Sequence, residues 1–122
     1  MRVFKTKFFA RFAKKENISD LSLSEAVSRV NRGLIDADLG GGVIKQRVAR
    51  PGEGKSGGYR TLLAFRSNCH VFFVYGFAKN QRENISVREL AELRKTALLL
   101  FGLDAAGLAS ELNRRELEEV SA

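Results

Sequence analysis

The chain opens with apolar residues at helical spacing. A short strand is expected at Val3–Phe4, and Thr6 is placed to cap a first helix. Three phenylalanines then form an apolar face against basic residues: Phe8, Phe9 and Phe12.

Two capping-box patterns, each a serine followed three residues later by a glutamate, mark two further helix starts. They are Ser22 with Glu25 and Ser86 with Glu89. Apolar residues at helical spacing follow both: Leu23, Ala26, Val27 and Val30 after the first, and Leu90, Leu93, Ala97, Leu100 and Phe101 after the second. The sequence therefore predicts a second helix ending near Asn31–Gly33 and a third ending at Gly102.

Between these helices the period changes from helical to alternating. After the pliable run Gly40–Gly42, strands are expected at 43–50, 59–66 and 70–77, joined by a glycine-rich loop at 51–58 and a tight turn. The third strand is rich in Val and Phe, which favours a central position in the sheet.

The element order is thus β-α-α-β-β-β-α, which indicates an α+β fold. Short connections predict a small, mainly antiparallel sheet that the first strand joins, with the two N-terminal helices and the C-terminal helix on one side. One domain is expected over residues 1–103. An acidic tail, 104–122, would form a short helix and an extended Leu117–Val120, and would either fold back over the basic face or dock a partner.

Charge is unevenly distributed in a chain with a net charge of +7. Every charged side chain from Arg2 to Lys15 is basic, and basic residues dominate again from Lys45 to Arg66. This pattern favours a polyanionic partner such as nucleic acid, although surplus charge also keeps small proteins soluble.

Cysteine content and hydropathy indicate the cellular compartment in which the protein is expected. The lone Cys69 forms no internal disulfide, and no signal-peptide core or membrane-length apolar run is present. We therefore expect a cytoplasmic protein without a membrane partner. No metal-binding motif occurs in the sequence, and no cofactor is expected.

Three motifs are candidates for chemistry. Gly54-Lys55-Ser56 is similar to the end of a phosphate-binding loop, but Ala49 stands where its first glycine is needed and a strand follows, which disfavours nucleotide hydrolysis. The single His70 adjoins Cys69 on one strand, so their side chains point to opposite faces and do not suit nucleophilic catalysis.

The third motif is a distributed set of cations. Lys45 and Arg47 are two apart on a strand and share a face, and the expected hairpin brings Arg60 beside them. RNA cleavage by a 2′-hydroxyl needs positive charge at the phosphorane, and a lysine among other cations is a plausible general base. The alternative is a binding face without turnover.

Three segments together resemble the RelE/HigB toxin family, especially its HigB-like branch. They are Gly41-Gly42-Val43-Ile44-Lys45-Gln46-Arg47-Val48-Ala49, Gly54-Lys55-Ser56-Gly57-Gly58-Tyr59-Arg60 and Phe73-Val74-Tyr75-Gly76-Phe77-Ala78-Lys79-Asn80. The similarity covers roughly Phe4 to Phe101.

The resemblance implies a toxin that cleaves messenger RNA on the ribosome without metal and is neutralised by a cognate antitoxin, often of helix-turn-helix type. Carried over by motif, Lys45 and Arg47 would contact the RNA backbone and Arg60 would stabilise the transition state. Further RNA or ribosome contacts would come from Lys55, Tyr59 and Lys79. Some relatives use a C-terminal tyrosine or a histidine as acid or base, but no tyrosine follows Tyr75 here.

Two other functions stay open at this point. One is a toxin of the related ParE type, which shares the scaffold and acts on gyrase without cutting RNA. The other is a non-enzymatic basic module that binds nucleic acid or a regulator.

Overall fold

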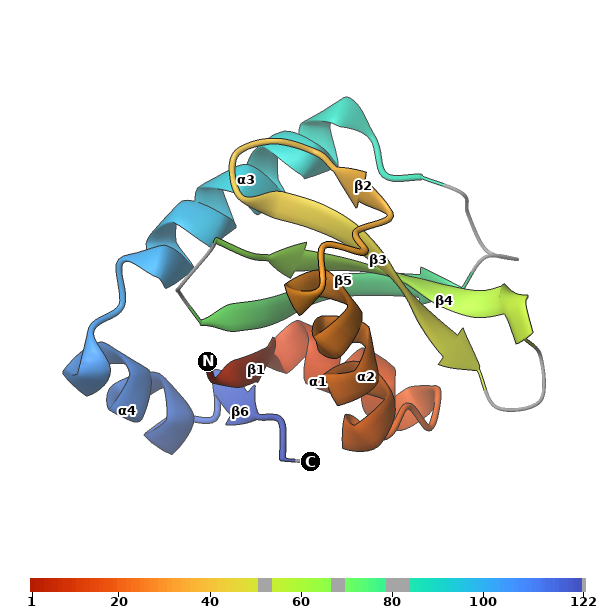
Figure 1. The fold of residues 1–122 in the computed structure, drawn as a ribbon. Coiled ribbons are helices and arrows are strands. Elements are labelled where there is room, and N and C mark those ends of the chain that lie inside the picture. Colours follow the sequence, from red (N-terminus) through yellow and green to blue (C-terminus); the bar gives the residue numbers. More distant parts are fainter. Residues whose placement is uncertain (51–53, 67–69, 79–83, 122) are drawn as a thin grey trace.

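The computed structural model describes residues 1–121 apart from 51–53, 67–69 and 79–83. Along the chain the elements are β1 (Val3–Thr6), α1 (Lys7–Lys15), α2 (Asp20–Asn31), β2 (Ala37–Asp38), β3 (Val43–Arg50), β4 (Gly54–Ala64), β5 (Val71–Ala78), α3 (Val87–Phe101), α4 (Ala105–Asn113) and β6 (Leu117–Glu119). Figure 1 shows these elements arranged around one twisted sheet. Within the described ranges no helix has the length and apolar character needed to cross a bilayer.

The sheet has the strand order β2-β3-β4-β5-β1-β6. β1 runs parallel to β5, and the remaining neighbours are antiparallel. The predicted α+β class, the mainly antiparallel sheet and the interior position of β5 are therefore confirmed. β4 begins at Gly54, earlier than the expected Tyr59, so the second half of the predicted loop is strand.

The expectation that all helices pack on one side is wrong. Successive strand residues belong to different apolar clusters: Ile44 and Phe73 pack with α1 and α2, whereas Val43 and Phe72 pack with α3 and α4. Because neighbouring residues of a strand point to opposite faces, the helices cover both faces of the sheet. The nearly unbroken burial of β5 has the same cause.

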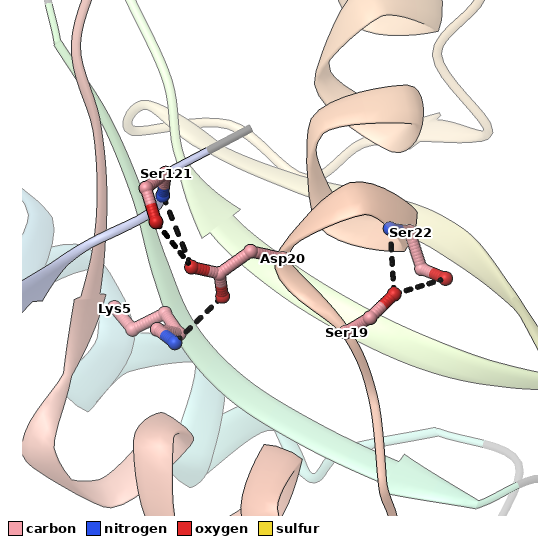
Figure 2. Close-up of polar contacts among 5 residues, drawn as sticks. All are labelled: Lys5, Ser19, Asp20, Ser22 and Ser121. Carbon is pink, nitrogen blue, oxygen red and sulfur yellow. Dashed lines mark hydrogen bonds and ion pairs between the residues drawn. The ribbon is translucent and has the colours of Figure 1, made fainter.

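Helix starts follow the capping rules, with one correction. Thr6 caps α1, and Ser86 with Glu89 forms the predicted capping box of α3. The predicted box at Ser22 is wrong, because the Ser19 hydroxyl accepts the Ser22 backbone N–H at 3.1 Å and α2 begins at Asp20 (Figure 2). Ser19, three residues before Ser22, is an equally good N-cap residue, and sequence spacing alone does not show which of the two serines caps the helix.

Glycines at the β2–β3 turn let α3 approach the sheet. Gly40, Gly41 and Gly42 all have positive φ, between 63° and 82°. A Cβ at Gly42 would lie 2.5 Å from the Phe101 ring. The glycine run therefore supplies both the left-handed backbone and the space that α3 needs.

The C-terminal tail adds to the sheet rather than covering the basic residues of β3 and β4. The expected short helix and extended segment are present as α4 and β6, and β6 pairs with β1 (Figure 1). Arg2 and Glu119 form an ion pair at 2.8 Å. At the start of α2, Asp20 accepts hydrogen bonds from Lys5 at 2.8 Å and from the Ser121 backbone at 3.0 Å (Figure 2).

Asp20 therefore joins β1, α2 and the tail through one carboxylate. Burial would by itself raise the pKa of Asp20, but the hydrogen bonds from Lys5 and Ser121 outweigh it and hold the pKa below its ordinary value of 3.8.

We predict that Asp20→Asn lowers the free energy of unfolding by about 1 kcal/mol at pH 7, because it removes the charge that Lys5 contacts. Since the folded-state pKa is depressed, this contribution is complete above the unfolded-state pKa and is lost as the pH falls through the folded-state value. Urea unfolding across a pH series should therefore show the gap to the wild type closing below about pH 4.

Glu25→Gln, at an exposed site on the same helix, is the control and should change stability by less than about 0.5 kcal/mol. A gap between Asp20→Asn and the wild type that stayed constant down to pH 2 would contradict a charge-based contribution.

Candidate nucleic-acid interface

The register of β3 and β4 brings the predicted cations together. Arg47 is directly opposite Arg60, and Lys45, two residues before Arg47, is opposite Leu62. All three cations are half-buried. The prediction that Lys45, Arg47 and Arg60 share one face of the hairpin is therefore confirmed.

β5 completes this face with aromatic residues. The cross-strand partners form two rows of three, Arg47–Arg60–Phe77 and Lys45–Leu62–Tyr75. We call these six residues the cationic face. It lies on the α3 side of the sheet, and Lys45 donates to the Asn84 side chain at 3.0 Å just before α3 begins.

Two buried guanidinium nitrogens on the cationic face lack hydrogen-bond partners among the described residues. They are Nε of Arg47 and Nη1 of Arg60, the directly opposed pair. Like charges opposite each other on adjacent strands are destabilising, and a buried donor without an acceptor costs about 1–3 kcal/mol. An anion bound at the exposed parts of the two guanidiniums would offset their mutual repulsion, because each guanidinium pairs well with a phosphate or carboxylate.

The backbone that carries Arg47 is fixed by side chains at the edge of the sheet. The Asp36 carboxylate accepts the Arg47 N–H at 2.6 Å, and the Arg29 guanidinium donates to the Arg47 carbonyl. Among the described residues β2 pairs only with Ile44 and Lys45, so these contacts occupy polar groups of β3 that β2 leaves unpaired. They also hold Arg47 in its register against Arg60.

Gln46, between Lys45 and Arg47, is a fully buried polar residue. Its amide oxygen accepts the Asp36 N–H at 3.1 Å. Its amide nitrogen donates to the carbonyls of Leu34 at 3.0 Å and Ala26 at 3.3 Å. One side chain thus joins α2, the segment before β2 and β3.

Three of the predicted binding residues do not join the described part of the cationic face. Tyr59 lies on the opposite side of the sheet, 2% exposed, with its hydroxyl donating to the Glu16 carbonyl at 3.2 Å. A ring buried in this way has no face for a base, so Tyr59 has a core role. The side chain of Lys55, in β4, and all of Lys79 lie outside the described residues.

The other two sequence candidates gain no support from the fold. Gly54 begins a strand, so the Gly54-Lys55-Ser56 motif does not precede a helix. His70 lies beside β1, where its ring contacts Phe4 and its Nδ1 accepts the Arg2 N–H at 3.4 Å. Among the described residues no cluster of three or more His, Cys, Asp or Glu side chains could hold a metal ion.

No role was predicted from the sequence for Tyr75 and Phe77, the aromatic residues beside the cations. Tyr75 and Phe77 contact each other with ring centroids 6.0 Å apart, and the exposed Phe8 stacks on Tyr75 at 5.5 Å. The alternation around Gly76 could have indicated that Tyr75 and Phe77 share a face with Arg60. The sequence places Phe8 on one apolar face of the first helix with Phe9 and Phe12, and nothing in the periodicity distinguishes it from them.

The fold and the cationic face together define a small, basic α+β protein with a sheet surface suited to a polyanion. Comparison with protein families matches residues 1–120 to the RelE family, described as the RelE toxin of the RelE/RelB toxin–antitoxin system. Because the match covers nearly the whole chain, this protein belongs to the RelE toxin family and has a cognate antitoxin as its partner. A search of curated proteins finds no match.

We predict that Gln46→Leu lowers the free energy of unfolding by about 2–4 kcal/mol. The substitution keeps the side chain's approximate size but leaves the Asp36 N–H and the Ala26 and Leu34 carbonyls without this partner. Chemical denaturation measures the loss. Thr61→Val, which removes one buried hydrogen bond to the Gln46 carbonyl, is the comparison and should cost about 1 kcal/mol. Equal stability of Gln46→Leu and the wild type would refute this role of the amide.

Proposed function

We propose that this toxin is a metal-independent endoribonuclease that cleaves messenger RNA on the ribosome and thereby inhibits translation. The observation that carries the proposal is the opposed pair Arg47 and Arg60, with buried donors that have no partner among the described residues. Membership of the RelE family supports the same reading, since the family's toxins act on translation.

The proposed reaction is attack by a ribose 2′-hydroxyl on the adjacent phosphate. The bond from the 2′-oxygen to phosphorus forms while the bond from phosphorus to the 5′-oxygen breaks. A base takes the 2′-hydroxyl proton, and an acid protonates the departing 5′-oxygen. Negative charge grows on the phosphorane between these steps, and fixed cations stabilise it most at that point.

Each cation has a proposed role. Arg60, in the middle strand of the cationic face, would contact the reacting phosphate, and Arg47 and Lys45 would hold the RNA backbone beside it. Lys55 and Lys79 would extend the contacts to RNA or ribosomal RNA. The half-buried Tyr75, across Leu62 from Lys45, offers an aromatic surface for an unpaired base.

The cellular setting follows from the same proposal. The toxin would act in the cytoplasm, where messages are translated. The three motifs of the chain support the HigB-like branch of the family, in which the antitoxin is often a helix-turn-helix protein.

We predict that Arg60→Ala abolishes growth arrest on induction and slows cleavage of a translated message by about 10²- to 10³-fold, because it removes a cation from the phosphorane. Growth and primer-extension mapping of cleavage ends are the measurements. Arg66→Ala is the matched control. Arg66 is exposed beyond the end of β4 and lies over the Phe101 ring, so its loss should leave cleavage unchanged.

Other outcomes would replace the proposal. Growth arrest with intact message and DNA-damage signalling would indicate a gyrase-directed toxin of the ParE type. RNA binding that weakens in Arg60→Ala, with no cleaved product from the wild type, would indicate a non-enzymatic binding module.

A further inference from the structure

An aromatic side chain at the start of α1 extends the cationic face beyond the sheet. Phe8 is 59% exposed, and its ring stacks on the Tyr75 ring at a centroid distance of 5.5 Å with 21° between the planes. Tyr75 in turn contacts Phe77 at 6.0 Å, and Phe77 is the cross-strand partner of Arg60. The three rings therefore form a continuous row from the opposed arginines to α1, which we call the aromatic row.

The position of Phe8 is fixed by the way α1 begins. The Thr6 hydroxyl, which caps the helix, donates to the Val74 carbonyl of β5 at 3.2 Å. The Lys7 N–H donates to the Glu116 carbonyl of the tail at 2.9 Å. Because the first turn of α1 is held from both sides, Phe8 presents its ring without further ordering of the backbone when a ligand binds.

A glycine in β5 lets α1 lie close to the sheet. A Cβ at Gly76 would lie 2.6 Å from the Phe12 ring. Phe12 and Phe9 pack on the side of the sheet that α1 and α2 cover, whereas Phe8 contacts Tyr75 on the side of the cationic face. The first turn of α1 therefore supplies an aromatic ring to each side of β5, and only the ring beside the cations stays exposed.

The exposed Phe8 ring has a face available for a ligand. Near-parallel rings meet face to face, so Tyr75 covers only one face of Phe8. A single exposed phenylalanine is normal on a protein surface, but this one continues a row that begins beside the opposed arginines. Nucleobases stack on such rings whatever their sequence, because every base has a π-face. The aromatic row thus has the arrangement of a platform for an unpaired base.

Basic residues of α1 lie next to Phe8. Lys7 precedes it, and Arg11 is its i+3 neighbour on the helix surface. A hollow of about 150 Å³ follows along α1 toward the tail. Its charged lining residues are four bases and one acid: Lys7, Arg11, Lys14, Arg115 and Glu118. A phosphate next to a base on Phe8 would therefore meet positive charge.

Acidic residues lie on the other side of Phe8. There it lines a hollow together with Glu111 and Glu116, of which Glu111 is paired with Arg114 at 3.2 Å. Carboxylates repel phosphates, so an RNA strand is expected to continue along the basic residues of α1 instead.

We propose that the aromatic row is a base-stacking subsite, in which an unpaired base of single-stranded RNA stacks on the open face of Phe8 and the adjoining backbone lies along Lys7 and Arg11. The inference rests on the proposed function for the identity of its ligand, and it adds a binding residue outside the sheet. Phe8 is a positioning residue: it holds the RNA in place on the opposed arginines and takes no part in the chemistry.

A fluorescence titration tests the stacking directly. The chain contains no tryptophan, so Phe8→Trp places a single indole at the subsite. A single-stranded 2′-O-methyl RNA, which lacks the attacking hydroxyl and stays uncut, should quench this indole to saturation through base stacking. Leu21→Trp, at a leucine 73% exposed on α2, is the matched control and should not be quenched.

Affinities for the same RNA, measured by fluorescence anisotropy at low salt, test the contribution of the ring. Phe8→Ala should weaken binding by about fivefold or more. Phe8→Tyr should restore it, whereas Phe8→Leu should not, because leucine keeps apolar volume without an aromatic face. Circular dichroism confirms that the variants remain folded.

The salt dependence of binding tests the path of the backbone. Arg11→Ala should weaken binding and reduce the salt slope by about one, because it removes a phosphate contact. Arg32→Ala, at an exposed arginine that ends α2, should leave both quantities unchanged.

Three results would overturn the proposal: an unquenched Phe8→Trp, wild-type affinity in Phe8→Leu, or equal quenching by fully paired RNA, whose bases are not free to stack on the ring. None of these results depends on cleavage. Quenching of Phe8→Trp by a protein that never cuts a translated message would keep the stacking subsite and remove the nuclease. Cleavage by a protein whose Phe8→Trp variant is unquenched would do the reverse.

Discussion

The arrangement of the site depends on one buried amide. Gln46 lies between Lys45 and Arg47 in the sequence of β3, and its side chain is fully buried. It hydrogen-bonds to the Ala26 carbonyl of α2 and, in the segment before β2, to the Leu34 carbonyl and the Asp36 N–H. Because a buried amide without partners is costly, these contacts fix the register of β3 against the helical layer. A slip of one residue would expose Gln46 and bury its two charged neighbours. The hydrogen bonds of Gln46 therefore determine which face Lys45 and Arg47 occupy.

On the other face of β3 the local interactions are unfavourable rather than satisfied. Arg47 and Arg60 oppose each other with donors that have no partner within the described residues, an arrangement that weakens the fold. The surrounding structure holds it in place: Asp36 and Arg29 fix the Arg47 backbone, and Thr61, next to Arg60, donates to the Gln46 carbonyl at 2.6 Å. A site whose own charges repel each other, but whose neighbouring residues have their hydrogen bonds satisfied, is typical of a surface preorganised for a ligand.

The sequence predicted most of the fold, because alternation and capping are local properties. The bounds of β3, the cap at Ser86 and the shared face of Lys45, Arg47 and Arg60 all follow from spacing. Two of the failures depend on tertiary packing. Tyr59 was assigned to RNA, but its ring fills the core beside Phe12, and whether α3 joins the other helices or covers the opposite face is not encoded in its own periodicity.

The two-sided covering of the sheet also explains why the site is where it is. On the side of α1 and α2 the apolar cluster reaches Val48, Tyr59 and Ala78, so this end of the sheet is filled. On the other side the cluster of α3 and α4 packs on Val43, Ala64 and Phe72, toward the opposite ends of the same strands. Lys45, Arg47 and Arg60 lie beyond that cluster, where their charged side chains do not compete with apolar helix contacts for space. Since β6 closes the far edge beside β1, the tail stabilises the sheet without approaching these cations.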